Sequence, residues 1–232
     1  MKDSVTNHLL KIVIAARESR VNVSFIDGWK RIFGEAELLE VHRKIGLLYK
    51  LIDAAAQEVL IVDPDQTEAV DHWRRQLYSG LSVAATKNWM DFHGYLDTHT
   101  INYLKMQATL VHLRNGDSDI DHEELLRAKS LLLEAINEIT ESTLSDQSKL
   151  AIIRRIRTLI ASIDDYSLTG NDAVFDQFKS AIYEIATNQE VREKGPGTKF
   201  SQAAEVLANI LTSATGIQQL VGPTLKFLGL GK

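Results

Sequence analysis

Turn-forming residues are scarce in this sequence, and this scarcity constrains the fold more than any other feature. The 232 residues contain thirteen glycines and only three prolines, Pro64, Pro196 and Pro223. A chain built from many short strands, or from alternating strands and helices, needs turn residues about every ten positions. The sequence therefore predicts an all-α fold, a multi-helix bundle of about seven long helices with an amphipathic helical tail at the C-terminus.

Apolar side chains recur every three to four positions along most of the chain, which is the spacing of one face of an α-helix. Ser145 and Asp121 precede two of these stretches as capping residues. The segment NVSFIDGW, residues 22–29, is expected to be a turn, and Gly170 is expected to end a helical segment. The helices predicted from this pattern cover residues 4–18, 36–60, 67–81, 96–113 or 100–113, 121–139, 145–163, 173–187 and 201–221.

The tryptophans and a leucine-rich stretch supply the largest apolar side chains. Trp29, Trp73 and Trp89 each lie among apolar neighbours at helical spacing, so we interpret them as core or interface anchors rather than base-stacking platforms. The helix predicted over residues 121–139 is defined by Leu125, Leu126, Leu132, Leu133, Ile136 and Ile139.

The sharpest change in composition comes near residue 190. The stretch EVREKGPGTK places charged residues around Gly195 and Gly197, as is typical of an exposed linker. We predict an all-helical body over residues 1–190, a linker rich in glycine, proline and charge over 191–200, and an amphipathic helical tail over 201–232.

Composition limits the classes of protein to which the chain can belong. Apolar residues make up 44% and charged residues 25%, as in ordinary folded domains. The net charge of -5 argues against a dedicated nucleic-acid-binding protein, which usually carries a positive excess. The sequence has no cysteine, which excludes disulfides, thiolate metal sites and cysteine nucleophiles. Because the N-terminus lacks a long apolar stretch, we predict a cytoplasmic protein.

Two motifs resemble metal sites, and neither is complete. DSDID, residues 117–121, places carboxylates at positions one, three and five of a calcium loop. That loop needs a glycine where His122 stands and a bidentate glutamate where Ala128 stands. HEELL begins like a zinc-protease helix but has Leu126 in place of the second histidine. We therefore predict no metal and no cofactor.

Catalytic motifs are incomplete as well. No two histidines lie four residues apart, although His93 and His99 can approach each other in a folded chain. All-helical RNases of the HEPN type usually have four to six residues between an arginine and the histidine that follows it, whereas seven residues separate Arg114 from His122. We interpret the chain as a non-enzyme and keep a nuclease that uses Arg114, His112 or His122 as an alternative.

A basic cluster lies in IIRRIR, residues 152–157. On a helix, Arg154 and Arg155 point away from the isoleucine face, so a solvated surface is the simplest interpretation of Arg154, Arg155 and Arg157. The alternative is a patch that contacts phosphate or an acidic protein partner.

The C-terminal tail has one apolar helical face. Burying five or six such side chains contributes on the order of 10 kcal/mol before entropy is counted. The face must therefore be covered by the body, by another protein or a second copy, or by a membrane surface. The candidate docking residues are Leu207, Ile210, Ala214, Ile217, Val221, Leu225 and Leu228.

The stretch LSDQSKLAIIRRIRTLIASIDDYSLTGNDAVFDQFKSAI, residues 144–182, resembles a pattern that recurs in uncharacterised all-helical bacterial proteins. The pattern has a leucine- and isoleucine-rich helix, an aspartate-tyrosine pair near its end, a glycine turn and a further amphipathic helix. Proteins with this pattern often accompany mobile or phage-defence genes. The resemblance implies a bacterial origin and an antiviral defence context, and it assigns no catalytic residue.

Together these observations favour a non-catalytic helical protein that binds another protein or forms a homo-oligomer. The C-terminal helix is the expected docking or self-association element. The main alternative is an abortive-infection effector whose tail associates with membranes.

Overall fold

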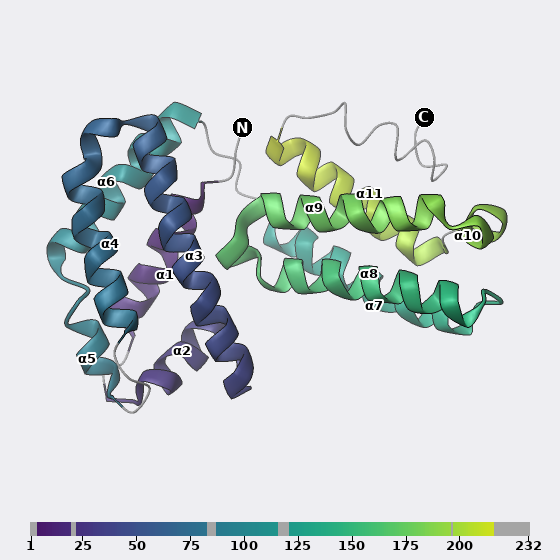
Figure 1. Ribbon diagram of the computed structural model, residues 1–232, viewed down its shortest axis with the longest axis horizontal. Coiled ribbons are helices and arrows are strands. Elements are labelled where there is room, and N and C mark those ends of the chain that lie inside the picture. Colours follow the sequence, from purple (N-terminus) through teal and green to yellow (C-terminus); the bar gives the residue numbers. More distant parts are fainter. Residues whose placement is uncertain (1–3, 20–21, 83–86, 116–120, 196, 216–232) are drawn as a thin grey trace. The chain divides into compact units, whose positions relative to one another are not determined.

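The computed structural model describes residues 4–19, 22–82, 87–115, 121–195 and 197–215. In these ranges the chain forms eleven α-helices, one short 3₁₀ helix and no strand, apart from an isolated bridge between Ser24 and Asn88. The all-α class is confirmed, and short helices in the connections make the total larger than predicted. The chain divides into two compact units, Ser4–Asp117 and Ser118–Lys232, which Figure 1 shows in sequence colours.

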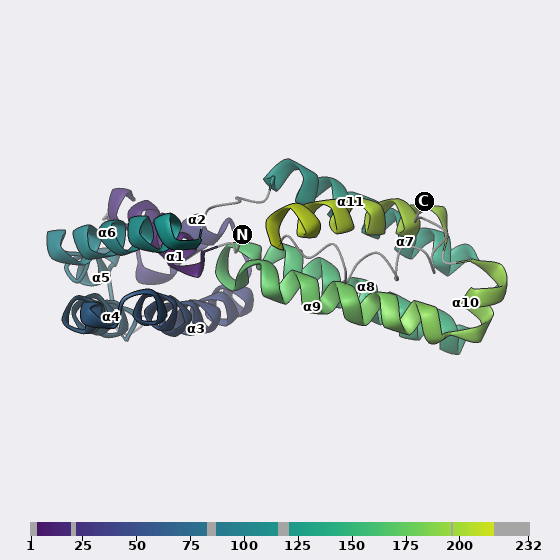
Figure 2. The same ribbon diagram turned by 90° about the horizontal axis from the view of Figure 1, so that it is seen from above.

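The first unit is an up-and-down bundle of four long helices. Its elements are α1 (Val5–Glu18), α2 (Phe25–Phe33), α3 (Leu38–Val62), η1 (Pro64–Gln66), α4 (Thr67–Leu81), α5 (Trp89–His93) and α6 (Thr98–Asn115). α1 and α4 each pack against both α3 and α6, which closes the bundle. Successive long helices run antiparallel, as Figure 1 and Figure 2 show. The connection between α3 and α4 is short, whereas the other two connections contain α2 and α5.

Aromatic side chains join α2 and α5 at one end of this bundle. The rings of Phe25, Trp29, Trp89 and Phe92 pack with centroids 4.9 to 6.3 Å apart. The backbones of the two segments are also paired, since the amide of Trp89 donates to the carbonyl of Val23 at 2.9 Å. Trp29, Trp73 and Trp89 expose 1% or less of their surface, which confirms them as core residues.

The turn predicted over residues 22–29 is wrong, because α2 begins inside this segment. The hydroxyl of Ser24 accepts a hydrogen bond from the amide of Asp27 at 3.0 Å and donates one to its carboxylate at 2.7 Å. This is a helix N-cap, which the sequence shows as a serine three residues before an acid. Gly28, which suggested a turn, lies within the helix where α5 approaches it closely.

The second unit is also an up-and-down four-helix bundle. Its elements are α7 (His122–Glu141), α8 (Asp146–Asp164), α9 (Tyr166–Thr187), α10 (Gln189–Lys194) and α11 (Thr198–Thr215). α7, α8, α9 and α11 contact one another in a closed ring around the apolar core. The predicted caps are confirmed: Asp121 accepts from the amide of Glu123 and Ser145 from that of Ser148.

The chain changes direction at Gly170, near the start of α9. Its φ of 67° and ψ of -170° are non-helical, and this region of backbone space favours glycine. Regular helix resumes after Gly170 and runs to Thr187. The prediction that Gly170 interrupts a helical segment is therefore confirmed.

The described part of the predicted tail, residues 201–215, belongs to a core helix of the second unit. α11 begins at Thr198, and α10 occupies the first part of the predicted linker. The predicted boundaries at residues 190 and 200 thus fall within one unit, and the chain divides near residue 117 instead. The buried residues of α11 are Phe200, Ala203, Ala204, Val206, Leu207, Ala208, Ile210 and Leu211.

Candidate functional site

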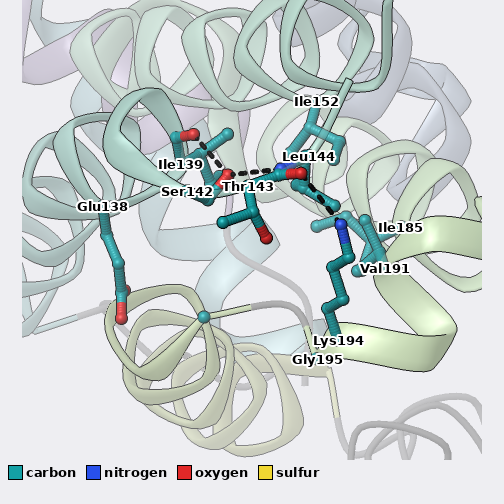
Figure 3. A pocket seen from close by; sticks show the side chains of 11 residues that line it. Glu138, Ile139, Ser142, Thr143, Leu144, Ile152, Ile185, Val191, Lys194 and Gly195 are labelled. Atoms are coloured by element: carbon teal, nitrogen blue, oxygen red, sulfur yellow. Dashed lines mark hydrogen bonds between the residues drawn. The ribbon is translucent and has the colours of Figure 1, made fainter. Parts of the chain in front are cut away.

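A cavity of about 300 Å³ lies at the end of the second bundle where α10 meets the connection between α7 and α8. Figure 3 shows its lining residues. Its apolar wall comes from four helices and one connection, and each of these side chains is at most 8% exposed. The wall residues are Ile139, Leu144, Ile152, Ile185 and Val191.

Polar groups surround the mouth of this cavity. The ammonium of Lys194 donates to the carbonyl of Thr143 at 2.8 Å, a contact drawn in Figure 3. The hydroxyl of Ser142 donates to the carbonyl of Ile139 at 2.7 Å. The Ser142 hydroxyl therefore adds a second bond to a carbonyl in the last turn of α7, and Lys194 ties α10 to the connection that follows α7.

Glu138 closes the same end of the bundle by capping α11. Its two carboxylate oxygens accept from the amides of Thr198 at 3.0 Å and Lys199 at 2.9 Å. A negative charge at a helix N-terminus is stabilising, because the first amides lack partners within the helix. Gly197 lets the backbone come this close, since a side chain there would contact the Glu138 carboxylate at 2.9 Å.

A second acid performs a similar role across the cavity. Glu190 of α10 accepts from the amide of Ser145 at 2.8 Å, just before α8 begins. This hydrogen bond holds the pKa of the Glu190 carboxyl below its ordinary value. Both acids at this end of the bundle are therefore engaged with backbone amides.

One solvent-facing side of α7 carries no charge. Its residues follow one another at helical spacing over about 21 Å, and all are exposed. Leu126 and Leu133 each expose 48% of their surface, more than a leucine in a core would. We call this surface the α7 face, and it consists of Leu126, Ser130, Leu133, Asn137 and Thr140.

Charged residues flank the α7 face, and several of them form ion pairs within the chain. Arg127 pairs with Glu124 at 3.3 Å. The ammonium groups of Lys129 and Lys199 lie 2.5 Å from Asp164 and 2.6 Å from Glu134. The face is therefore an uncharged strip with ion pairs along its border.

Sequence reasoning did not single out the α7 face, although a signal was present. Leu126 and Leu133 were part of the pattern that defined this helix. The pairs Leu125-Leu126 and Leu132-Leu133 give α7 more leucine than one buried face accommodates. The structure buries Leu125 and Leu132 and leaves their neighbours exposed.

The residues assigned to tail docking are placed differently from the prediction. Leu207 is fully buried and Ile210 is 8% exposed, and both lie in the core between α11 and its neighbouring helices. They form no open docking surface, because the bundle itself covers them. The side chain of Ala214 lies outside the described residues, as do Ile217, Val221, Leu225 and Leu228.

Two of the three arginines in the basic cluster on α8 are exposed, and the third forms an ion pair. Arg155 pairs with Glu184 of α9 at 3.4 Å. Arg154 and Arg157 are exposed, one helical turn apart, and within the described ranges no acid lies within ion-pair distance of either. The solvated-surface interpretation fits Arg154 and Arg157 best, because Arg155 is partly buried and engaged by Glu184.

The structure brings histidines together in a pair that the sequence did not indicate. The Nε2 of His93 donates to the carbonyl of Arg17 at 3.0 Å, and no contact between His93 and His99 is present among the described residues. His99 instead lies beside His72, with ring centroids 6.1 Å apart. No group of three or more His, Cys, Asp or Glu side chains among the described residues is placed to hold a metal ion.

The residues of the nuclease alternative belong to different units. His112 and Arg114 lie near the end of α6 in the first unit, and both are exposed. His122 is the first residue of α7 in the second unit.

No protein-family model matches the chain, and neither a curated protein nor a solved structure matches it. Among the described helices, none combines the length and the apolar character needed to cross a bilayer.

Proposed function

We propose that this chain is a non-catalytic helical protein that binds another protein through the α7 face. The observation that carries the proposal is the half-exposure of Leu126 and Leu133 on a strip without charge. The centres of protein interfaces are depleted of charged residues and rich in apolar ones, with a polar border. The α7 face has this composition, and its flanking ion pairs supply the border.

The expected partner element is a helix with an apolar stripe. Leu126 and Leu133 are seven residues apart, which is the repeat that packs two helices side by side. Burying the exposed halves of both side chains contributes about 2 kcal/mol, equivalent to more than tenfold in affinity. A second copy of this chain and an unrelated protein are both compatible with this chemistry.

The proposal retains a docking or self-association role for the C-terminus, restricted to the residues after Thr215. The predicted apolar positions Ile217, Val221, Leu225 and Leu228 are in this stretch. Leu207 and Ile210 are buried in the bundle core. Truncation after Thr215 therefore keeps these two core residues and removes the candidate docking residues that follow them.

The test is quantitative capture by variants of the full chain. Leu126→Ser combined with Leu133→Ser removes the apolar part of the α7 face, and Leu150→Ser is the matched control because Leu150 is a 71% exposed leucine on α8. We expect one companion to bind wild type and Leu150→Ser equally and the double variant at least tenfold more weakly. Sedimentation equilibrium of the same three proteins identifies a second copy as the companion.

Equal capture by all three proteins, with equal oligomeric states, would show that the α7 face is not the binding surface. Circular dichroism of each variant must first show unchanged helix content, since both substitutions are on exposed positions and leave the core intact.

The antiviral defence setting implied by the resemblance over residues 144–182 is part of this proposal. Host cells that lack the protein should become more sensitive to phage, and the full chain should restore resistance. We expect the α7 double variant to fail in this complementation and Leu150→Ser to succeed. Equal plating of phage on all strains would remove the defence setting and leave the binding proposal to the capture experiment.

A further inference from the structure

We propose that the cavity between Ile139 and Val191 binds a carboxylate with a medium-length alkyl chain. The alkyl chain fills the apolar interior, and the carboxylate lies at the mouth beside Lys194. This inference goes beyond the proposed function, because the cavity and the α7 face share no residue.

The size of the cavity sets the length of the alkyl chain. A cavity of about 150 Å³ lined by apolar side chains takes up benzene. The cavity of about 300 Å³ has twice that volume, at the lower limit of small-molecule sites. It therefore has room for about eight to twelve carbon atoms.

The interior favours hydrocarbon over water. Five aliphatic side chains form the wall, and each is at least 92% buried. A water molecule against this wall finds fewer polar partners than one at the mouth, where Ser142, Thr143 and Lys194 lie. Each methylene group moved from water into this space gains about 0.8 kcal/mol.

The mouth provides donors for an anionic head group. An ammonium has three hydrogens, and Lys194 uses one of them on the Thr143 carbonyl. No carboxylate among the described residues lies within ion-pair distance of Lys194. The side chain of Thr143 also borders the cavity, in the centre of the view in Figure 3.

The acids nearby do not compete for Lys194 at contact distance. Glu138 holds the first amides of α11, and Glu190 holds the amide of Ser145. Their negative charge would nevertheless attract a cationic head group, so a cationic amphiphile is the main alternative ligand for this cavity. Compounds with the same alkyl chain and different head groups therefore test which head-group charge the cavity prefers.

The experiment is an amide NMR titration of the full chain with octanoate, octan-1-ol and octylammonium. We expect octanoate to give saturable shifts at the amides of residues 139–144 and 185–195, and to bind at least fivefold more tightly than either of the other compounds. Thr143→Trp, on an exposed position at the mouth, should abolish the shifts for all three.

Lys194→Gln tests the head-group contact. It should weaken octanoate at least fivefold and leave octan-1-ol unchanged, because glutamine keeps a donor for the Thr143 carbonyl but carries no charge. The matched control is Lys179→Gln, an exposed lysine on α9 paired with Asp176 at 2.8 Å, which should change neither ligand.

Three outcomes would overturn the inference: no saturable shift at the cavity amides, shifts that persist in Thr143→Trp, or tighter binding of octylammonium than of octanoate. The Leu126→Ser and Leu133→Ser double variant should bind octanoate like wild type. A failure of the α7 proposal is thus separable from a failure of this one.

Discussion

Gly28 lies where α2 touches α5, and the space there admits no larger residue. A β-carbon at this position would overlap the indole of Trp89. We predict that Gly28→Ala lowers the free energy of unfolding by about 1–3 kcal/mol, because the two helices must separate to admit the methyl group. Chemical denaturation followed by circular dichroism measures the change.

Gly46 provides the matched control for this substitution. It is exposed inside α3, and a β-carbon there meets nothing within 4 Å. Gly46→Ala should therefore raise the free energy of unfolding by up to about 1 kcal/mol through helix propensity. Equal effects of the two substitutions would contradict the close packing of α2 on α5.

Asp97 makes the stability of the first unit depend on pH. Burial acts to raise the pKa of this carboxyl, but hydrogen bonds from Thr100 and His72 outweigh burial and hold the pKa below its ordinary value of 3.8. A carboxyl with a lower pKa in the folded chain stabilises the fold above its unfolded pKa, and this contribution disappears as the pH falls through the folded pKa.

We predict that Asp97→Asn is less stable than wild type at pH 7 and that the difference shrinks below about pH 4, where the unfolded carboxyl becomes protonated. Urea denaturation at pH 7, 5, 4 and 3 measures the difference. A gap that stays constant over this range would show that ionised Asp97 does not stabilise the start of α6.

At the scale of elements, the attachment of α11 depends on an acid that belongs to α7. We predict that Glu138→Ala lowers the free energy of unfolding by about 0.5–2 kcal/mol, as loss of a helix cap does. Hydrogen exchange should be faster at the amides of Thr198 and Lys199, because they lose their acceptor.

Glu134→Ala is the control for this prediction. Glu134 lies one turn earlier on α7 and pairs with Lys199 through side chains that are about half exposed. Removal of such a surface pair should cost at most about 1 kcal/mol and leave the Thr198 amide protected. If both variants exchanged at the same rate, Glu138 would not be the cap of α11.

Helix ends were predictable from the sequence where local capping residues define them. Asp121 and Ser145 cap their helices as predicted, because such a cap needs only an amide two or three residues away. α2 and α5 were missed because they are stabilised by aromatic contacts between residues sixty or more positions apart, which a local sequence pattern does not reveal. The glycine-rich stretch near residue 196 was interpreted as a linker because a turn and a linker share the same composition.

At the scale of the whole molecule, the chain consists of two separately closed bundles. Each unit buries its own apolar core: Leu9, Ile52 and Trp73 are buried in the first, and Leu132, Ile156 and Leu207 in the second. We predict that residues 1–117 and 118–232, produced separately, are each helical and unfold cooperatively. Circular dichroism during heating measures this. A fragment that remained unfolded or aggregated would contradict the independence of its core.

Neither the cavity nor the α7 face could be predicted from the sequence alone. The cavity is lined by residues from 138 to 197, and no sequence pattern shows that these segments converge. The sequence supplied the apolar stripe of α11 correctly, but it did not decide whether the chain itself or a partner covers that stripe, because both burials satisfy the same physics. The sequence did not show which leucine of each adjacent pair in α7 is exposed. The structure shows that Leu125 and Leu132 fill the core, which leaves their neighbours on the surface.

The central claim is that a partner contacts the α7 face, and site-specific photo-crosslinking in the native host tests it most directly. A photoreactive phenylalanine is placed at position 133 in one strain and at position 150, on exposed α8, in another. The account predicts a discrete covalent adduct from position 133 and none of the same size from position 150. No adduct from position 133, or the same adduct from both positions, would contradict the claim.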